Sequence, residues 1–317
     1  MIDAVRDDAS LSQAVETFFR STFSTSNPLI TEAVKRMLAA GGKRLRPRVT
    51  LLAAQACGGE PLEHLYLAAY MELIHVATLI HDDVVDNAQL RRGVNATAVD
   101  YGNRVSVLAG DYLFAWIFKN VTANYDAPIP HILSATLADI CDGEVLQLRA
   151  LGDLQTDVTR YLEVAEKKTA SLFAASASCG AIAAGGEARL VEALREFGRW
   201  YGVAFQMTDD LLDLTAEEAT IGKPVGNDLR ERKMTIPLIC ALERGDRDFT
   251  ERIARFYGGS DGEAAIPAIV ADIVAQGGIE ATRRLLHNCL DRAELSLRSL
   301  EPTPARSELQ SLVEALR

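Results

Sequence analysis

Cysteines are few in this sequence, and their spacing does not suit a disulfide framework or a structural metal site. The five cysteines include no Cys-x-x-Cys pair: Cys57, Cys141, Cys179, Cys240 and Cys289. An odd number of scattered thiols is typical of reduced side chains, which argues against a zinc site and a disulfide-rich fold. We therefore expect the protein to work in a reducing compartment.

Long apolar runs are also missing. The most apolar stretch, residues 65–80, is interrupted by Glu72 and His75. It therefore falls short of the about 18 apolar residues that a membrane-spanning helix needs. Residues 1–17 contain several acids and lack the basic and apolar regions of a secretory signal peptide. We expect a soluble protein, located in the cytoplasm.

Basic residues are outnumbered. The chain of 317 residues has 33 Lys and Arg against 44 Asp and Glu, a formal net charge of −11. This balance argues against nucleic acid as the main partner, because phosphate backbones bind basic surfaces. A phosphorylated small substrate is still compatible with it, since metal ions can invert the local charge. Hydrophobic residues make up 48%, enough for a sizeable core.

The apolar residues recur at the helical period, and no segment alternates with the period of two that is typical of strands. The expected helical segments are 34–38, 65–85, 105–121, 132–148, 158–184, 190–214 and 234–242. Short breaks rich in Gly and Pro separate them, and none is long enough for a domain linker. We predict an all-α protein with a single domain over residues 1–317. Helices around 65–85 and 165–184 are apolar on nearly all sides, which is typical of the centre of a bundle.

Carboxylates end one of these apolar helices. Residues 81–86 read His-Asp-Asp-Val-Val-Asp, so Asp82 and Asp86 share a helix face, roughly 6 Å apart. Two like charges at that spacing repel, and a cation between them would relieve the repulsion. Taken alone, the pattern also fits a solvated helix end or a partner arginine.

A second cluster repeats the pattern more than 120 residues later. Residues 205–213 read Phe-Gln-Met-Thr-Asp-Asp-Leu-Leu-Asp, with Asp209 and Asp213 on one face and Gln206 one turn before them. Oxygen ligands of this kind suit Mg²⁺, which keeps several waters and is often completed by substrate phosphates. Two such clusters facing one cavity would make a metal–phosphate site.

Basic residues accompany both clusters. They occur in five groups: residues 41–47 (Gly-Gly-Lys-Arg-Leu-Arg-Pro), Arg91 with Arg92, Lys167 with Lys168, Lys223, and Lys233. Arg offers a bidentate fork for phosphate and Lys a mobile point charge. Each base alone is equally compatible with a solvated surface, but five groups beside two carboxylate clusters favour diphosphate binding. His75, two turns before Asp82, is either a core histidine or a substrate ligand.

Taken together, these motifs resemble the trans-isoprenyl diphosphate synthases, of the medium- or long-chain type such as octaprenyl diphosphate synthase. The resemblance covers about residues 30 to 245 and rests on an ordered set of motifs. They are residues 41–47, 81–86 with 91–93, 108–111 (Leu-Ala-Gly-Asp), 142–144 (Asp-Gly-Glu), 168–170 (Lys-Thr-Ala), and 205–213 with 222–224 (Gly-Lys-Pro). It implies the isoprenoid synthase fold, a bundle of antiparallel helices around a central cavity, and a homodimer.

The resemblance also implies a role for each matching residue. Asp82, Asp86 and Asp209 would ligate Mg²⁺, with Asp83, Asp210 and Asp213 in support. The residues implied to hold isopentenyl diphosphate are Lys43, Arg46, His75 and Arg92. Those implied to bind the allylic diphosphate are Arg91, Lys168, Thr169, Gln206, Lys223 and Lys233.

The implied reaction ionises the allylic C–O bond, after which the alkene of isopentenyl diphosphate attacks the cation and a proton is lost. Mg²⁺ and Lys168 would stabilise the leaving diphosphate. One departure concerns residues 231–233, which read Glu-Arg-Lys where the family often has Glu-Gly-Lys. This substitution bears on the position of Lys233.

Product length in this family depends on how far the cavity extends below the first cluster. Short-chain members usually carry a bulky aromatic residue there, whereas this chain has Ala77 and Thr78. We therefore expect an all-trans product of C25 or longer, whose lipophilic tail would allow loose association with membranes. Residues 132–140 or a partner subunit are alternative sources of the cavity floor.

Four alternatives are considered. A short-chain farnesyl or geranylgeranyl diphosphate synthase differs only in product length. A class I terpene cyclase shares the bundle, but its second metal motif is normally built on Asn, Ser and Glu. A non-catalytic partner subunit of a heteromeric synthase usually loses one aspartate cluster, and both are intact here. A purely structural bundle leaves both clusters unexplained.

Overall fold

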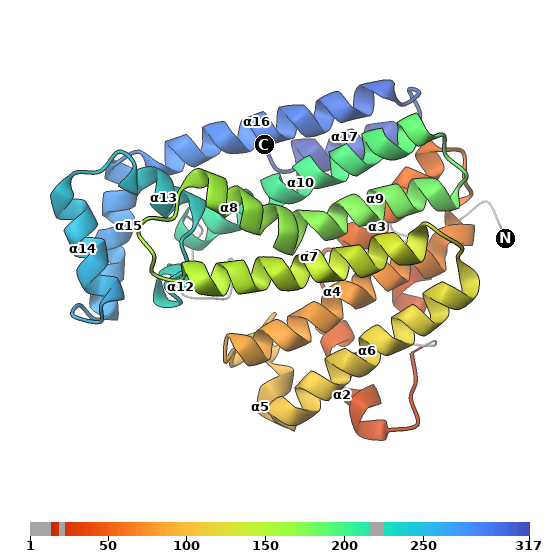
Figure 1. Ribbon diagram of the computed structural model, residues 1–317, viewed down its shortest axis with the longest axis horizontal. Coiled ribbons are helices and arrows are strands. Elements are labelled where there is room, and N and C mark those ends of the chain that lie inside the picture. The colour runs from red at the N-terminus through yellow and green to blue at the C-terminus, as the bar shows by residue number, and fades with distance from the viewer. Residues whose placement is uncertain (1–13, 19–22, 216–224) are drawn as a thin grey trace. The chain divides into compact units, whose positions relative to one another are not determined.

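The computed structural model describes residues 14–18, 23–215 and 225–317. These residues are mostly helical, and their only strands are the two-residue β1 (Leu90–Arg91) and β2 (Val94–Asn95) (Figure 1). The prediction of an all-α fold is confirmed. Lys223 lies outside the described residues. The chain divides into two compact units, each described by itself below. The single domain expected over residues 1–317 stays a prediction.

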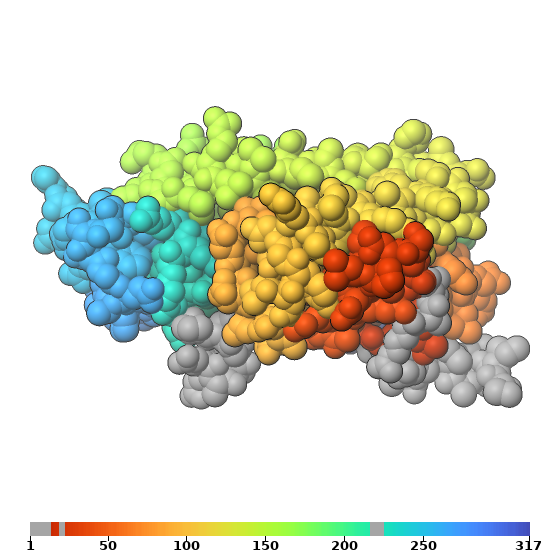
Figure 2. Space-filling model, turned by 90° about the horizontal axis from the view of Figure 1, so that it is seen from below, coloured from red at the N-terminus to blue at the C-terminus, as the bar shows by residue number. Residues whose placement is uncertain are grey.

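Unit 1 comprises residues 1–135, 172–198 and 297–309. Its elements are α2 (Pro28–Ala39), α3 (Leu45–Ala56), η1 (Pro61–His64), α4 (Leu65–Val85), β1, β2, α5 (Thr97–Tyr101), α6 (Asn103–Asn124), the start of α7 (Ile129–Ala150), α9 (Ser171–Ala183), the first part of α10 (Ala188–Thr215), η4 (Leu297–Ser299) and most of the residues in α17 (Pro304–Glu314). Helix α4 is mostly buried and packs against α3 and α6 (Figure 1). In Figure 2, α2 (red) lies against the surface of α5 and α6.

Glycines allow helices of unit 1 to approach each other closely. A Cβ added at Gly180 of α9 would lie 2.2 Å from the Thr50 carbonyl oxygen of α3. At Gly198 of α10 it would lie 2.4 Å from the Phe173 carbonyl oxygen of α9. Both distances are far below van der Waals contact, so the close packing of these helices requires glycine at both positions.

Unit 2 comprises residues 136–171, 199–296 and 310–317. Besides the remaining parts of α7, α10 and α17, it contains α8 (Val158–Ala165), η2 (Glu166–Ala170), α12 (Asn227–Arg230), α13 (Ile236–Leu242), α14 (Arg247–Tyr257), η3 (Glu263–Ala265), α15 (Ile266–Ala275) and α16 (Gly278–Ser296). Helix α13 is almost entirely buried and packs against α16. The segment η2 is a π-helical turn between α8 and α9.

The helices were also compared with the dimensions of a lipid bilayer. Within the part of the chain that the structure describes, no single helix has both the length and the apolar character needed to cross it. One bent pair, 263–275 with 278–299, meets the length and composition requirements together, with a bend of 61°.

Candidate functional site

The first aspartate cluster forms the C-terminal turn of α4. Asp86 is the C-cap residue, and its amide donates to the Asp82 carbonyl oxygen at 2.8 Å. Asp83 is fully buried and accepts from Arg91, with 2.7 Å from Nε and 2.5 Å from Nη2 to Oδ1. Asp82 and Asp86 are half-buried. The middle carboxylate is therefore paired inside unit 1, while the outer two reach the surface.

The end of α4 is fixed against α6 by His81. Its Nε2 lies 3.0 Å from the Val107 carbonyl oxygen and 3.4 Å from Asp111 Oδ1. A Cβ at Gly110 would lie 2.2 Å from the same Nε2, so only glycine leaves room for the imidazole. The 108–111 motif thus positions the cluster by holding the histidine directly before Asp82.

Residues 41–44 form a loop that leads into α3 and lies against Arg92. Arg92 donates through Nη1 to the Gly41 carbonyl oxygen. A Cβ at Gly42, where φ is 145°, would lie 2.7 Å from that nitrogen. Lys43 is exposed, whereas Arg44 is buried. The two glycines therefore allow the loop to contact the arginine that follows the aspartate cluster.

His75 lies among arginines of unit 1. Burial lowers its pKa well below 6.5, and the charges of Arg46, Arg92, Arg91 and Arg44 lower the pKa further. The imidazole is therefore neutral and can donate one hydrogen bond and accept another. The structure thus brings Arg46, His75 and Arg92 near one another, together with Arg91, which the resemblance assigns to the allylic diphosphate.

Two small residues lie one turn before the first cluster on α4. Ala77 is fully buried, and Thr78 is half-buried with its hydroxyl donating to the His75 carbonyl oxygen at 2.8 Å. Neither side chain is bulky enough to obstruct a long ligand. Their role in product length stays a prediction.

The second aspartate cluster lies near the end of α10, in unit 2. Thr169 Oγ1 donates to Gln206 Oε1 at 2.8 Å, and Gln206 Nε2 donates to Asp210 Oδ1 at 2.9 Å. The Ile236 amide approaches Asp210 Oδ2 at 3.3 Å. Asp210 is buried, whereas Asp209 is exposed. This hydrogen-bonded chain joins three residues that the sequence predicts to act together.

Asp213 caps a neighbouring helix. It accepts from the Asn227 amide through Oδ1 and from the Asp228 amide through Oδ2, both at 3.1 Å. These two residues begin α12, where backbone amides lack helical partners. The carboxylate of Asp213 is thereby oriented by unit 2 itself.

Asp228 belongs to the same carboxylate group, although the sequence analysis did not select it. Burial raises its pKa well above the usual value, and the charges of Asp210, Asp213 and Asp209 raise it further. Burial likewise raises the pKa of Asp210 to about 6. The only sequence signal for Asp228 was its position shortly after residues 222–224.

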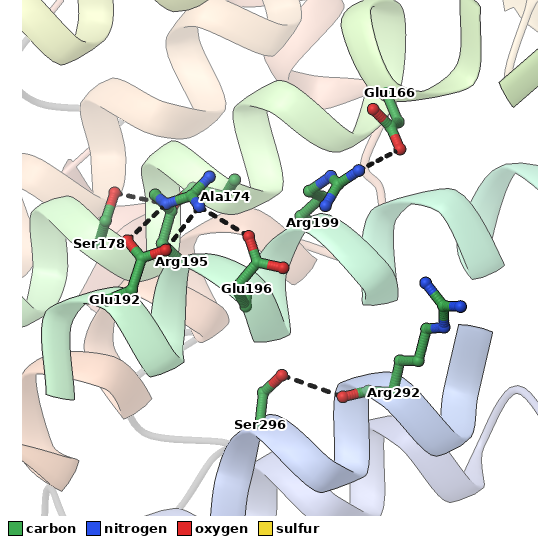
Figure 3. A network of polar contacts seen from close by, with 9 residues as sticks. All are labelled: Glu166, Ala174, Ser178, Glu192, Arg195, Glu196, Arg199, Arg292 and Ser296. Carbon is green, nitrogen blue, oxygen red and sulfur yellow. Dashed lines mark hydrogen bonds and ion pairs between the residues drawn. The ribbon is translucent and has the colours of Figure 1, made fainter. Parts of the chain in front are cut away.

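Lys168 is held on the π-helical turn. Its Nζ donates to Gln147 Oε1 at 2.8 Å and forms an ion pair with Glu144, both on α7. A Cβ at Gly143 would lie 2.6 Å from the Lys168 amide, which explains the glycine of the 142–144 motif. Arg199 bonds Glu166, the first residue of the turn, at 2.6 Å (Figure 3). Two helices therefore fix the turn that carries Lys168 and Thr169.

The departure at residues 231–233 has a backbone explanation. Arg232 adopts φ of 56°, in the left-handed region that glycine prefers. The carbonyl oxygen of Arg232 accepts from the Gly152 amide at 2.8 Å, and Lys233 Nζ lies 2.5 Å from Glu231 Oε2. The arginine thus keeps the glycine-like backbone, and Lys233 lies in unit 2 beside the carboxylate group.

The carboxylates meet some of the requirements of a binding site for a divalent cation. Among the described residues, no three side chains of Asp, Glu, His or Cys converge as a ready-made metal site. Mg²⁺ needs only one or two protein carboxylates when phosphates and waters complete its shell. Besides burial, the charges of Asp210, Asp213 and Asp209 raise the pKa of Asp228, and that of Asp209 raises the pKa of Asp210, which indicates a local excess of negative charge. The donor chemistry suits Mg²⁺, and Asp82, Asp86 and Asp209 as its ligands stay a prediction.

Three comparisons place these observations among known proteins. The family model described as polyprenyl synthetase matches residues 27–273. Octaprenyl diphosphate synthase of Escherichia coli (strain K12) is 37% identical over 284 residues, covering 90% of this chain and 88% of that protein. Short chain isoprenyl diphosphate synthase of Methanothermobacter thermautotrophicus is 35% identical, covering 96% and 94%.

Solved structures agree with the sequence relatives. The crystal structure of polyprenyl synthase from Caulobacter crescentus CB15, complexed with calcium and isoprenyl diphosphate, has a TM-score of 0.93 and 37% identity. The match covers 98% of this chain and 95% of that one. The similarity therefore extends over both units and includes the segments that carry the two aspartate clusters.

Proposed function

Because the chain belongs to the polyprenyl synthetase family, we propose that it is a prenyltransferase that lengthens an allylic diphosphate with isopentenyl diphosphate. The observation that carries this proposal is the pair of Asp-Asp-x-x-Asp clusters, each with its own set of basic residues. A cyclase needs one diphosphate site, whereas a synthase needs two, so the two sets of bases favour elongation over cyclisation.

The residues of unit 1 suit the homoallylic substrate. Arg46, Arg92 and neutral His75 lie near one another, and Lys43 is exposed on the adjoining loop. Arginine forks and a lysine point charge bind the oxygens of a diphosphate, and His75 can donate a neutral hydrogen bond. Isopentenyl diphosphate keeps its diphosphate during the reaction, so a purely basic site without carboxylate ligands is appropriate for it.

The residues of unit 2 suit the allylic substrate, with Arg91 and Lys223 as further ligands by resemblance. Lys168 is oriented by Gln147 and Glu144, and Thr169 is bonded to Gln206. Lys233 lies in the same unit and is paired with Glu231. In this arrangement Lys168 stabilises negative charge on the departing diphosphate, because its ammonium is already fixed in place.

Asp82, Asp86 and Asp209 would hold Mg²⁺, which when bound neutralises the charge that develops on the leaving diphosphate. The carboxylates of Asp83, Asp210 and Asp213 orient the chain around these ligands through the hydrogen bonds described above. The allylic C–O bond breaks, and the alkene carbon of isopentenyl diphosphate bonds to the allylic carbon. The proton that the isopentenyl unit then loses passes to the departing diphosphate. No side-chain nucleophile is needed in this reaction.

The assembly is proposed by resemblance, and the location from the scattered cysteines and the acidic N-terminal residues. We propose a homodimer in the cytoplasm, with loose membrane association through the lipophilic product. Sedimentation of the purified chain, with and without product, measures both assembly and association with vesicles.

The product proposed is all-trans and of C25 or longer. Relatives at 37% and 35% identity carry names for long and for short products, so the length must be argued from this chain. Ala77 is small and fully buried on α4, and Thr78 beside it is also small. We propose that neither residue closes the floor beneath the growing chain.

Replacing Ala77 with Phe should shorten the product, because an aromatic ring would fill the space used by later isoprene units. Overpacking costs typically about 1–3 kcal/mol, so thermal stability must be followed as well. Ala68 supplies the matched control, since it is equally buried on α4 but lies nine residues earlier, on the opposite helix face. An unchanged product profile in Ala77→Phe would place the floor elsewhere.

The experiment that tests the proposed function is product analysis with the purified chain. The protein is incubated with Mg²⁺, labelled isopentenyl diphosphate and one allylic primer: geranyl, farnesyl or geranylgeranyl diphosphate. The masses of the products are then measured by mass spectrometry. Elongated diphosphates that require both substrates support the proposal. A hydrocarbon formed from the allylic diphosphate alone would indicate a cyclase, and inactivity of the pure chain would indicate a partner subunit.

A further inference from the structure

Arg44 differs from the two basic residues beside it. Lys43 is exposed and Arg46 is half-buried, whereas Arg44 is only 7% exposed. It precedes α3 as the N-cap residue, with φ of 47° in the left-handed region. A non-glycine residue is strained there, so other interactions must hold it in place.

Those interactions involve every nitrogen of its guanidinium. Nε donates to Glu16 Oε1 at 2.6 Å, Nη1 to Glu72 Oε1 at 2.9 Å, and Nη2 to the Leu38 carbonyl oxygen at 2.8 Å. Burial alone disfavours the charge, but the bonds with Glu16 and Glu72 outweigh it and raise the pKa of Arg44. A guanidinium whose three nitrogens are all bonded within the protein is not placed to bind a phosphate.

Glu72 connects Arg44 to the helix of the site. It is 1% exposed and lies on α4 one turn before His75. The loop of residues 41–44 is therefore held at both ends, by Arg92 at the Gly41 carbonyl oxygen and by Glu72 at Arg44. Lys43 lies between these two fixed points, and Arg46 lies in the first turn of α3 directly after them.

We propose that the buried Arg44–Glu72 ion pair is a positioning device that fixes Lys43 and Arg46 for the diphosphate of isopentenyl diphosphate. The inference rests on the proposed function and deepens it by assigning a role to two residues outside the substrate contacts. Arg44 acts through Lys43 and Arg46, so it is a positioning residue and not a catalytic one.

The test uses one chemical change at two places. Glu72→Gln removes the charge of the buried partner, and Glu308→Gln removes the partner of Arg48, which lies 2.6 Å away on the exposed side of α3. We expect Glu72→Gln to raise KM for isopentenyl diphosphate about tenfold, because small displacements of binding groups carry large penalties. The KM for the allylic diphosphate should stay within about twofold, and Glu308→Gln should change neither value beyond about twofold.

The outcomes separate the inference from the proposed function. A wild-type chain that elongates no allylic diphosphate overturns the proposed function itself. An active wild type whose Glu72→Gln variant shows equal changes in both KM values, or a lowered Tm with no change in either, overturns the positioning role. If Glu72→Gln does not fold, Arg44→Lys keeps the charge but loses the fork that bonds Glu72 and the Leu38 carbonyl oxygen. The same selective rise in KM supports the inference there, and unchanged KM values overturn it.

Discussion

The two aspartate clusters have the same sequence pattern but different surroundings. In the first, the buried carboxylate of Asp83 is balanced by Arg91. In the second, the buried carboxylate of Asp210 is bonded to neutral donors, the Gln206 amide and the Ile236 backbone N–H. The buried carboxylate of the first cluster is therefore neutralised within its own unit, whereas that of the second lies in an excess of negative charge. The comparison teaches that the buried aspartates, Asp83 and Asp210, are bonded within their own units, while Asp82 and Asp209 reach the surface, and their role as metal ligands stays a prediction.

The outer carboxylates give the largest expected effect. Asp82→Asn and Asp209→Asn should each lower kcat/KM for elongation by about 10²–10³ or more, because each would weaken binding of the Mg²⁺ that neutralises the leaving diphosphate. Thermal unfolding should change little, since Asp82 is half-buried and Asp209 exposed. Steady-state kinetics and Tm measured on the same samples check this. An active Asp209→Asn variant would break the proposed equivalence of the two clusters.

The middle carboxylates distinguish the two environments. Asp83→Asn should lower the free energy of unfolding by about 3–5 kcal/mol, because it leaves Arg91 without its buried partner. Asp210→Asn, measured with EDTA, should change it by only about 1 kcal/mol, since one lost hydrogen bond is offset by the removal of a buried charge. Urea unfolding of both variants measures the difference. Equal destabilisation would contradict the contrast drawn here.

Much of the fold followed from the sequence, and the reason is periodicity. The expected helix over residues 65–85 has the bounds of α4, and short segments rich in Gly and Pro, such as those near Gly58, Pro128 and Gly185, lie between helices. The sequence also singled out the two carboxylate clusters, because carboxylates at the end of apolar helices need an explanation, and their role stays a prediction. Family and fold class are confirmed by the comparisons.

Other features depend on contacts that no local pattern records. The π-helical turn at Lys168, the burial of Arg44 and the role of Asp228 arise from neighbouring helices in three dimensions. Glu72 was visible only as an interruption of an apolar stretch. Its role as an ion-pair partner could be seen only from the position of Arg44, 28 residues earlier in the chain.

The pH dependence of stability should also differ between the units. His75 has a folded pKa below 6.5, so the unfolded chain binds more protons at acid pH, and stability is lost as the pH falls below about 6.5. Asp210 has a pKa raised from 3.8 to about 6, so its contribution is lost as the pH rises through that window. Denaturant titrations between pH 4 and 7, without metal, measure the free energy of unfolding of His75→Gln and Asp210→Asn. Each variant should lose one pH-dependent slope of this free energy, and the two slopes have opposite signs. Slopes of one sign would contradict the assignment.

The smallest expected effect concerns Arg232. Arg232→Gly should stabilise the chain by up to about 1 kcal/mol, because glycine adopts the left-handed conformation without strain, although it adds freedom to the unfolded chain. Arg232→Val should destabilise it, since β-branched residues tolerate that conformation poorly. Chemical denaturation of both variants gives the comparison. A less stable Arg232→Gly would mean that the side chain has contacts worth more than the backbone strain.

The central proposal is that aspartates of both clusters contribute to Mg²⁺-dependent binding of the allylic diphosphate. Calorimetric titration with a non-ionisable allylic diphosphate analogue, with and without Mg²⁺, tests it on the wild type, Asp82→Asn, Asp209→Asn and the double variant. We predict that each single change abolishes most of the Mg²⁺-dependent affinity and that the double variant binds no worse than either, because residues that share one ligand are not additive. Full Mg²⁺-dependent binding by either single variant, or strictly additive losses, would contradict the account.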